Sequence, residues 1–357
     1  MPAPDADVVA AWDRLVVEQG RPRSAPACVL AWYRHVLRDD ARARVVVVRR
    51  GGAVVGVLPL YVERDRWDAE IVRMAGHQVL VGVEPVVDPR WADEAEDAFA
   101  RAIADLRPTP STVELECTGH GGELLARVAR RSPAWFPRVS VVPSAAPEFA
   151  LDEDRYEAWL ERRHRTSGKQ ARRYARRLEE LGYRPVVSTS ASAVRERIPE
   201  LRRLYGERKE TRGGWGIGFG ARTATMLADV ADRLAIDGRV VVCTWERDGV
   251  ALAADLALTA GTTTTAWIGA VGSAESRYSP GHLTLLLLLE HAHATGSAVL
   301  DLGPGQEPYK VRYANAERPV EAALLERRSP LPARSVRALA TPSLRRVVRR
   351  ASGRDVP

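Results

Sequence analysis

The chain has 357 residues, of which 45% are hydrophobic and 28% are charged; this composition excludes the disordered, collagenous and disulfide-stapled classes and favours a soluble globular protein of roughly two domains. The formal net charge of +7 suits an anionic partner such as nucleic acid, anionic lipid or a phosphorylated cofactor, and the sign alone does not choose among them. The three cysteines form no C-x-x-C pair and the N-terminus has acids where a signal peptide needs a basic start, so we expect a reducing, cytoplasmic setting.

The pattern of residues 1–150 predicts one domain of mixed α and β structure. The predicted elements are, in order, helices over 8–19 and 27–37, a β-hairpin over 44–63, a helix over 91–106 and a strand over 111–117. The hairpin is expected because two runs of β-branched residues flank the pair Gly51-Gly52.

Residues 151–328 predict a second domain in which this order repeats. The predicted elements are helices over 161–185, 191–209 and 221–236, a hairpin over 239–261, a strand over 262–271, a helix over 282–294 and strands over 297–303 and 318–328. Placing Gly249, at the second hairpin turn, on Gly52 aligns the two hairpins and indicates an internal duplication. Hairpins give antiparallel pairs and the helical crossover gives a parallel pair, so an α/β fold with mixed sheets is predicted. Residues 329–357, rich in proline and arginine, are expected to form a loosely docked or disordered basic tail.

A basic helix is predicted at the start of the second domain, in ERRHRTSGKQARRYARRLEELGYRP. Arg165, Lys169, Arg172 and Arg176 fall on one face at helical spacing. This face could hold a polyphosphate, a nucleic acid or a tRNA. The alternative is a solvated amphipathic helix that only bridges the two domains.

The segment RYSPGHLTLLLLLEHA predicts a helix start directly after a strand. Ser279 suits the N-cap, Pro280 the first helical position and Gly281 the second. Free N–H groups at such a start form a ready anion site, although any capped helix begins in a similar way. The segment lacks both G-x-G-x-x-G and the Walker pattern, which disfavours a nucleoside triphosphatase. The run 285–289 is apolar all round and too short to span a bilayer, so the helix is expected to lie wedged between the sheet and other elements.

The stretch LDLGPGQEPYK (300–310) places reactive groups beside a strand end. Asp301 follows apolar residues, where a carboxylate is costly unless it is paired or used. A helical turn starting at Pro308 would carry Tyr309 and Lys310. The carboxylate, phenol and ammonium could then deprotonate an incoming amine and protonate a departing thiolate. The alternative is an Asp301–Lys310 salt bridge that only holds the turn.

Neither a metal site nor a covalent catalytic motif is predicted. His291 and His293 are two residues apart and so point to different sides of a helix, and Cys117 with His120 lacks a second pair. The sequence has no G-x-S-x-G elbow and no Cys/His signature, so a covalent enzyme intermediate is not expected.

Three segments in this order and spacing, SGKQARRYARRLEELG, YSPGHLTLLLLLEHAHATG and LDLGPGQEPYKVRYAN, resemble the GNAT-related acetyltransferase family of the cellulose and exopolysaccharide biosynthesis type. That family is also similar to the Fem-type peptidoglycan aminoacyltransferases. The resemblance spans roughly residues 12–328 and is strongest from Leu160 onward. It implies a tandem pair of GNAT-like domains, acetyl-CoA or another acyl-CoA as donor, and an amine, often on a sugar, as acceptor.

The resemblance also implies roles for individual residues. The implied donor-binding residues are Arg277, Tyr278, Ser279, Gly281 and His282, and we expect Lys169 of the basic helix to help them hold the donor's phosphates. The stretch 301–310 is implied to lie beside the acyl transfer point. Within it we expect Asp301 to act as base or amine-orienting group, Tyr309 as the acid and Lys310 as electrostatic support or substrate anchor. One departure is plain: ordinary GNAT enzymes show Q/R-x-x-G-x-G/A at the pyrophosphate loop, whereas here Arg277 is followed by YSPGH.

Two rival interpretations stay open. A Fem-type transferase would use aminoacyl-tRNA, with the basic helix as the tRNA-binding element, although the sequence shows no long helical arm inserted in the second domain. A non-catalytic binding protein could keep the same fold. The expected acceptor is a small molecule or a saccharide, and a nucleic acid is a partner only in the first rival interpretation.

Overall fold

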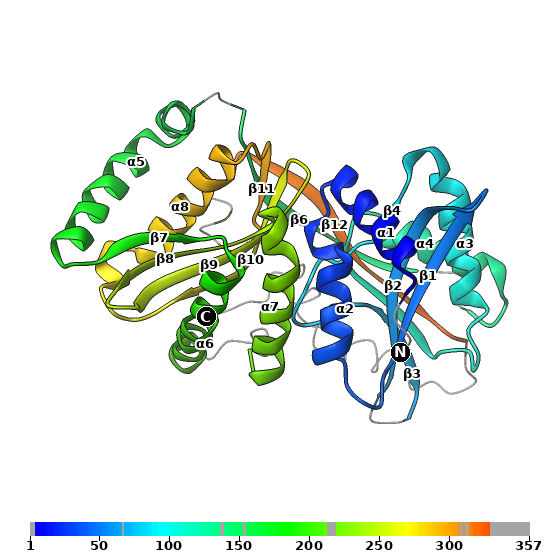
Figure 1. Ribbon diagram of the computed structural model, residues 1–357. Helices are drawn as coiled ribbons and strands as arrows, with labels where there is room; N and C mark the ends of the chain where they lie inside the picture. The colour runs from blue at the N-terminus through cyan, green and yellow to red at the C-terminus, as the bar shows by residue number, and fades with distance from the viewer. Residues whose placement is uncertain are drawn as a thin grey trace.

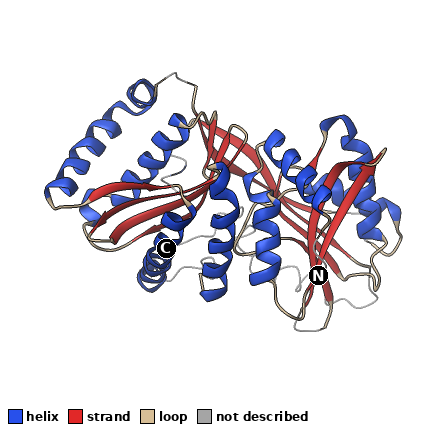
Figure 2. Cartoon of the chain, in the orientation of Figure 1, coloured by secondary structure: helices blue, strands red, loops and turns tan. Residues whose placement is uncertain are grey.

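The computed structural model describes residues 4–328 except 66–67, 136–138, 153–154, 213–218, 306, 308–309 and 311–313; at 117, 163–165, 167 and 208–212 it describes the backbone alone. The predicted basic tail, 329–357, therefore lies outside the described residues. The described strands form one mixed sheet that runs through the whole molecule, with helices on both faces (Figures 1 and 2).

The elements follow the predicted order. The helices are α1 (Ala6–Gln19), α2 (Pro26–His35), α3 (Ala92–Ala104), α4 (Gly121–Arg131), α5 (Tyr156–Glu180), α6 (Ala191–Arg212), α7 (Ala221–Leu234) and α8 (Pro280–Ala294). The strands are β1 (Arg42–Arg50), β2 (Ala53–Arg64), β3 (Glu70–Met74), β4 (Val86–Val87), β5 (Thr112–Thr118), β6 (Ser140–Ala150), β7 (Arg184–Ser188), β8 (Val240–Arg247), β9 (Val250–Ala260), β10 (Thr263–Val271), β11 (Val299–Asp301) and β12 (Ala316–Glu326). Each predicted helix and strand is present with shifted ends, whereas α4, β3, β4, β6 and β7 were not predicted.

Both predicted hairpins are confirmed, and their turns explain why. In the β1–β2 turn Gly51 and Gly52 have φ of 54° and 86°, and in the β8–β9 turn Asp248 and Gly249 have φ of 52° and 78°. Two consecutive positive φ angles match the twist of the flanking strands, and glycine or aspartate adopts them at the lowest cost.

The two halves of the sheet repeat one connection. β3 and β5 are parallel and joined through α3, and β10 and β11 are parallel and joined through α8. Each parallel pair follows a hairpin, which agrees with the predicted duplication.

The halves also exchange strands. The order of the described strands is β1-β2-β3-β5-β12-β6-β11-β10-β9-β8-β7, with β4 beside β2. β12, from the end of the second half, therefore lies beside β5 of the first, and β6, from the end of the first half, lies beside β11 of the second. Whether 1–150 and 151–328 behave as separate domains stays a prediction.

Helices cover both faces of the second half. α5 and α8 lie on one face and α6 and α7 on the other, and α2 of the first half packs against α7 (Figure 1). Leu285, Leu288 and Leu289 of α8 pack into one buried cluster with Val241 and Cys243 of β8, which confirms the predicted wedged helix. In the part of the chain that the structure describes, the helices are all too short or too polar to cross a membrane.

Candidate functional site

The start of α8 lies against the end of β10. Pro280 is the first helical residue, as predicted, and a Cβ atom on Gly281 would lie 2.4 Å from Cγ2 of Val271. Ser279 occupies the N-cap position, but its side chain makes no capping hydrogen bond, which corrects the prediction. The reason is its left-handed backbone, with φ of 50°, whereas a capping serine normally has an extended conformation.

α5 packs beside this helix start. The rings of Tyr174 and Tyr278 lie 5.9 Å apart, and the guanidinium of Arg277 lies 4.9 Å from the centre of the Tyr278 ring. Arg277 also pairs with Glu275, its Nη2 lying 3.2 Å from Oε2. The predicted donor-binding residues 277–282 therefore surround one helix start. Lys169 lies more than one turn before Tyr174 along α5, and no contact joins it to this group in the described part of the chain.

The outer face of α5 is strongly basic. Ala171 and Leu178 face inward against Leu283 of α8. The exposed side carries four cations that pair with no carboxylate among the described residues, namely Lys169, Arg172, Arg173 and Arg176. The predicted face is thus confirmed for three of its four members, and the side chain of Arg165 lies outside the described residues.

β11 ends at Asp301, whereas β10 continues past it toward the start of α8. Their parallel ladder joins Thr263–Thr265 to Val299–Asp301 and ends there, while β10 continues to Val271 beside the start of α8. At about 3.3 Å per residue, Thr265 and Val271 are about 20 Å apart. The β9–β10 register also shifts between Ala266 and Ile268, as at a β-bulge. Beyond Thr265, β10 therefore has no β11 partner on that edge, as far as its end at Val271.

Asp301 is buried on the face of the sheet opposite α8. Leu300 packs in the α8 cluster, and side chains alternate along a strand, so Asp301 points the other way. Its Oδ1 accepts a hydrogen bond of 2.6 Å from the Gly303 N–H, and its Oδ2 lies 3.3 Å from Nη2 of Arg318. Arg318, on β12, also pairs with Glu84 at 3.0 Å and with Glu148 of β6 at 3.3 Å. One guanidinium thus holds three carboxylates from three separate segments.

Lys310 holds the turn after β11, but not through Asp301. Its Nζ pairs with Oε2 of Glu307 at 3.1 Å and donates to the carbonyl oxygens of Pro304 at 3.2 Å and Gly303 at 3.4 Å. Burial lowers the pKa of Lys310, against the opposing effect of Glu307. Tyr309, the predicted acid, lies outside the described residues.

Arg23 of the first half reaches the same place. Its Nη2 donates to the carbonyl oxygen of Ala266 at 2.6 Å, directly after the β10–β11 ladder ends. A Cβ atom on Gly303 would lie 2.7 Å from Nη2 of Arg23, and one on Gly82 would lie 3.0 Å from Nη1. The absence of a side chain at both glycines lets the buried guanidinium lie between the two loops.

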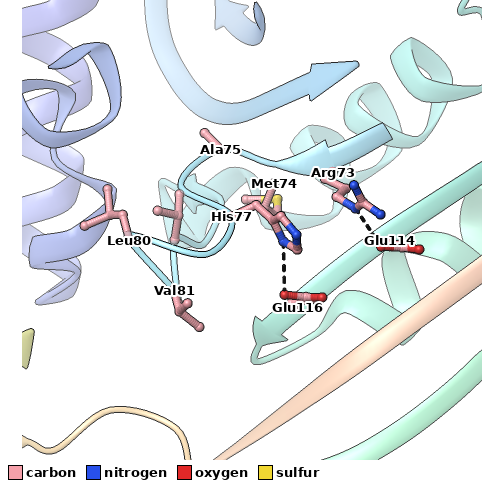
Figure 3. Close-up of a pocket in the computed structure, with 10 residues that line it drawn as sticks. Arg73, Met74, Ala75, His77, Leu80, Val81, Glu114 and Glu116 are labelled. Atoms are coloured by element: carbon pink, nitrogen blue, oxygen red, sulfur yellow. Dashed lines mark hydrogen bonds and ion pairs between the residues drawn. The ribbon is translucent and has the colours of Figure 1, made fainter. Parts of the chain in front are cut away.

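The corresponding position in the first half is closed by an ion pair. Arg73 and Glu114 form the last register pair of the β3–β5 ladder. Thr265 and Asp301 form the last pair of the β10–β11 ladder, so the two pairs occupy equivalent positions. Nε of Arg73 lies 2.7 Å from Oε2 of Glu114, and Nδ1 of His77 lies 3.3 Å from Oε2 of Glu116. Figure 3 shows these two pairs next to each other. The hollow that these residues line has a volume of about 20 Å³, enough for one or two waters.

Sequence reasoning found Asp301 and Lys310 but missed Arg23, Glu84, Glu148 and Arg318. Each missed residue is a charge within or beside an apolar or strand-like run, the same signal that singled out Asp301. The sequence could therefore have drawn attention to each of these residues separately. It could not predict that they converge, because their convergence depends on the exchange of strands between the halves.

Comparisons with known proteins agree with this architecture. Residues 162–311 match the family described as acetyltransferase (GNAT) domain, and the match does not specify the cellulose and exopolysaccharide type. No curated protein sequence matches the chain. The fold is similar to that of FemX, with a TM-score of 0.59 and 12% identity over 90% of this chain and 96% of that one.

Two further solved structures share the fold. The C-terminal domain of a lysylphosphatidylglycerol synthetase candidate from Agrobacterium fabrum has a TM-score of 0.59, with 13% identity over 94% of each chain. L-PGS from Bacillus licheniformis has a TM-score of 0.54, with 13% identity over 98% of this chain and 97% of that one. At such identities the likeness is one of fold, and the family match adds that residues 162–311 are similar to a GNAT-type acetyltransferase domain.

Proposed function

We propose that the chain transfers an acetyl or longer acyl group from acyl-CoA directly to an amine of a sugar or another small metabolite, in the cytoplasm. The GNAT match over residues 162–311 supports acyl transfer by the second half. The closed position at Arg73 and Glu114 makes the first half the poorer candidate for the reaction.

The observation that carries this proposal is that β10 continues well past the end of β11. The stretch of β10 from the end of β11 to the start of α8 is about 20 Å long, and an extended donor would lie along it. Acyl-CoA has matching chemistry, since a long amide-bearing arm joins its phosphates to its thioester. The phosphates would lie at the free N–H groups of α8, near residues 277–282.

The reaction needs a proton acceptor and a proton donor near Asp301. The amine nitrogen bonds to the thioester carbonyl carbon, the carbon–sulfur bond breaks, the nitrogen loses a proton and the thiolate gains one. Asp301 would orient the amine side of the reaction, and Lys310, through Gly303 and Pro304, would fix the turn beside it. Tyr309 remains the proposed acid.

The test is a thermal-shift screen with acetyl-CoA and longer acyl-CoAs, followed by transfer assays on amine acceptors. A bound donor should raise the melting temperature, and Asp301→Asn should cut turnover without unfolding the protein. A fully active Asp301→Asn variant contradicts that role. Donor binding without transfer or hydrolysis across the panel would favour a non-catalytic binding protein.

A second candidate is transfer from aminoacyl-tRNA, as in Fem-type enzymes. The observation that favours it is the outer face of α5, where four cations without carboxylate partners among the described residues would suit a phosphate backbone. The similarity to FemX is compatible with it. Tight acyl-CoA binding with no tRNA binding at physiological salt would exclude it.

A further inference from the structure

We propose that Glu148, rather than Asp301, is the carboxylate that accepts the proton of the acceptor amine. The inference rests on the proposed acyl transfer and deepens it. Glu148 lies on β6, the strand that the first half supplies to the second, outside the residues that match the GNAT domain.

The geometry distinguishes the two carboxylates. Asp301 and Glu148 are directly opposite each other in the β6–β11 ladder, so both lie on one face of the sheet. Both oxygens of Asp301 are engaged, one by the Gly303 N–H and one by Arg318. Oε1 of Glu148 lies 3.3 Å from Nε of Arg318, and no described residue bonds to its Oε2. The free oxygen of the pair therefore belongs to Glu148.

Solvent access points the same way. The side chain of Glu148 is 15% exposed, against 7% for Asp301 and 6% for Glu84, the other two carboxylates on Arg318. A base must come within hydrogen-bond distance of the proton that it removes, either directly or through one water. Of the three, Glu148 is the carboxylate best placed to meet a ligand.

The surroundings of Glu148 also suit a base. The charged groups that face it are Asp301 from β11, Arg318 from β12 and Arg21 from the segment before Pro22. Glu84 forms ion pairs with the same two arginines, and Lys310 and Arg23 lie on the far side of Asp301. Burial and the adjacent Asp301 raise the pKa of Glu148, against the opposing effect of Arg318. A carboxylate with a raised pKa takes a proton more readily near neutral pH.

The proton balance is complete without a further reactant. An acceptor that arrives as an ammonium gives one proton to Glu148, and the neutral amine then attacks the thioester carbonyl carbon. When the carbon–sulfur bond breaks, the second nitrogen proton passes to the thiolate. Glu148 returns its proton to solvent before the next turnover.

The test compares Glu148→Gln with Glu317→Gln, a matched control. Glu317 is an exposed residue of β12, close in the ladder to Glu148 and outside the cluster. We expect Glu148→Gln to lower kcat/KM by about 10²- to 10⁴-fold, the usual contribution of general base catalysis. We also expect it to abolish the fall in rate toward acid pH, while Glu317→Gln leaves both unchanged.

Asp301→Asn provides a second, independent readout. The two carboxylates are coupled, so the pH profile of the wild type alone does not say which of them is the base. The base is the residue whose substitution abolishes the fall in rate at acid pH, the acid limb of the profile. Removing the negative charge beside Glu148 should lower its pKa, so Asp301→Asn should keep the acid limb and move it to lower pH. A merely structural role for Glu148 would lower the rate without removing the limb.

The outcomes separate the two proposals. A wild-type protein that transfers no acyl group from any donor contradicts the proposed function. An active wild type with Glu148→Gln within about threefold of it at every pH overturns the role of Glu148 alone, since general base catalysis contributes far more. If Glu148→Gln does not fold, Glu148→Asp replaces it in the test. We expect this variant to retain the acid limb but to lose at least about tenfold in rate, because the shorter side chain misplaces the base. A wild-type rate for Glu148→Asp would overturn the proposal.

Discussion

Three carboxylates from distant parts of the chain converge on Arg318, so this residue has the largest local electrostatic role in the candidate site. Replacing it with methionine would leave Glu84, Glu148 and Asp301 crowded without their shared cation. We expect the free energy of unfolding to fall by about 1–3 kcal/mol, less than for a fully buried pair because Arg318 is partly exposed.

The pH dependence of this loss tests its cause. Urea unfolding of Arg318→Met should show a greater loss at pH 8 than at pH 5, because crowded carboxylates take up protons at the lower pH and repulsion is relieved. Arg318→Lys, which keeps the charge, should recover part of the stability at pH 8. An equal loss at both pH values would assign the effect to packing of the aliphatic part of the side chain.

Glu148 should carry a stability cost that its neutral analogue lacks. Its pKa is raised in the folded state, so its contribution to stability is fully present below the unfolded pKa and is lost as pH rises through the folded pKa. The unfolding free energy of Glu148→Gln, relative to wild type, should therefore rise between pH 4 and pH 8. Parallel stability curves for the two proteins would contradict this prediction.

At the scale of elements, the contact between α8 and β10 positions the proposed phosphate site. Gly281→Ala would place a Cβ atom against Cγ2 of Val271, and overpacking of this kind costs about 1–3 kcal/mol. We expect a lower melting temperature and weaker acyl-CoA binding. Adding Val271→Ala removes the clashing methyl group and should restore both, so a double-mutant cycle should show a coupling energy well above zero. Additive effects would mean that the two residues do not meet.

The outer face of α5 offers a second prediction at this scale. Changing Arg172, Arg173 and Arg176 together to glutamine, with Lys169 kept, should leave acyl-CoA binding nearly unchanged, because these three arginines lie outside the proposed donor site. If aminoacyl-tRNA is the donor, the same variant should bind tRNA more weakly. The slope of the logarithm of the binding constant against the logarithm of the salt concentration should also become shallower, by about 0.7–0.9 for each phosphate that the variant no longer neutralises. Filter binding at several salt concentrations measures this slope.

For the whole molecule, the sequence predicted what is local and missed what is long-range. Turn residues predicted the hairpins, and a hydrophobic run predicted the buried helix α8. A single carboxylate at the end of an apolar strand drew attention to Asp301. β6 was not predicted because Pro143 and Pro147 interrupt its strand pattern, and proline argues against a central strand. β12 was predicted as a strand, but nothing in its residues places it beside β5 and β6. Because Glu148 and Arg318 lie on these exchanged strands, the charged cluster could not be predicted either.

The exchange of strands should make the chain unfold as one unit. Removal of either half would leave β6 or β12 without a ladder partner, and open edges are unfavourable. The main core cluster also spans both halves, from Trp12 on α1 to Met226 on α7, and Nη1 of Arg239 lies 2.6 Å from Oδ2 of Asp13. We therefore expect tryptophan fluorescence and far-UV circular dichroism to report one coincident urea transition.

Two fragments sharpen this prediction, because they differ only in β6. A fragment of residues 151–328 lacks the strand that pairs with both β11 and β12, so we expect it to be unfolded or aggregated. A fragment of residues 140–328 restores those two ladders and should gain helical circular dichroism and solubility relative to the shorter one. If 151–328 folds as well as 140–328, or if the intact chain shows two separate transitions, the halves are independent domains. In that case Glu148 would contribute little to the fold of the second half, and any effect of its substitution on acyl transfer would have to come from the site itself.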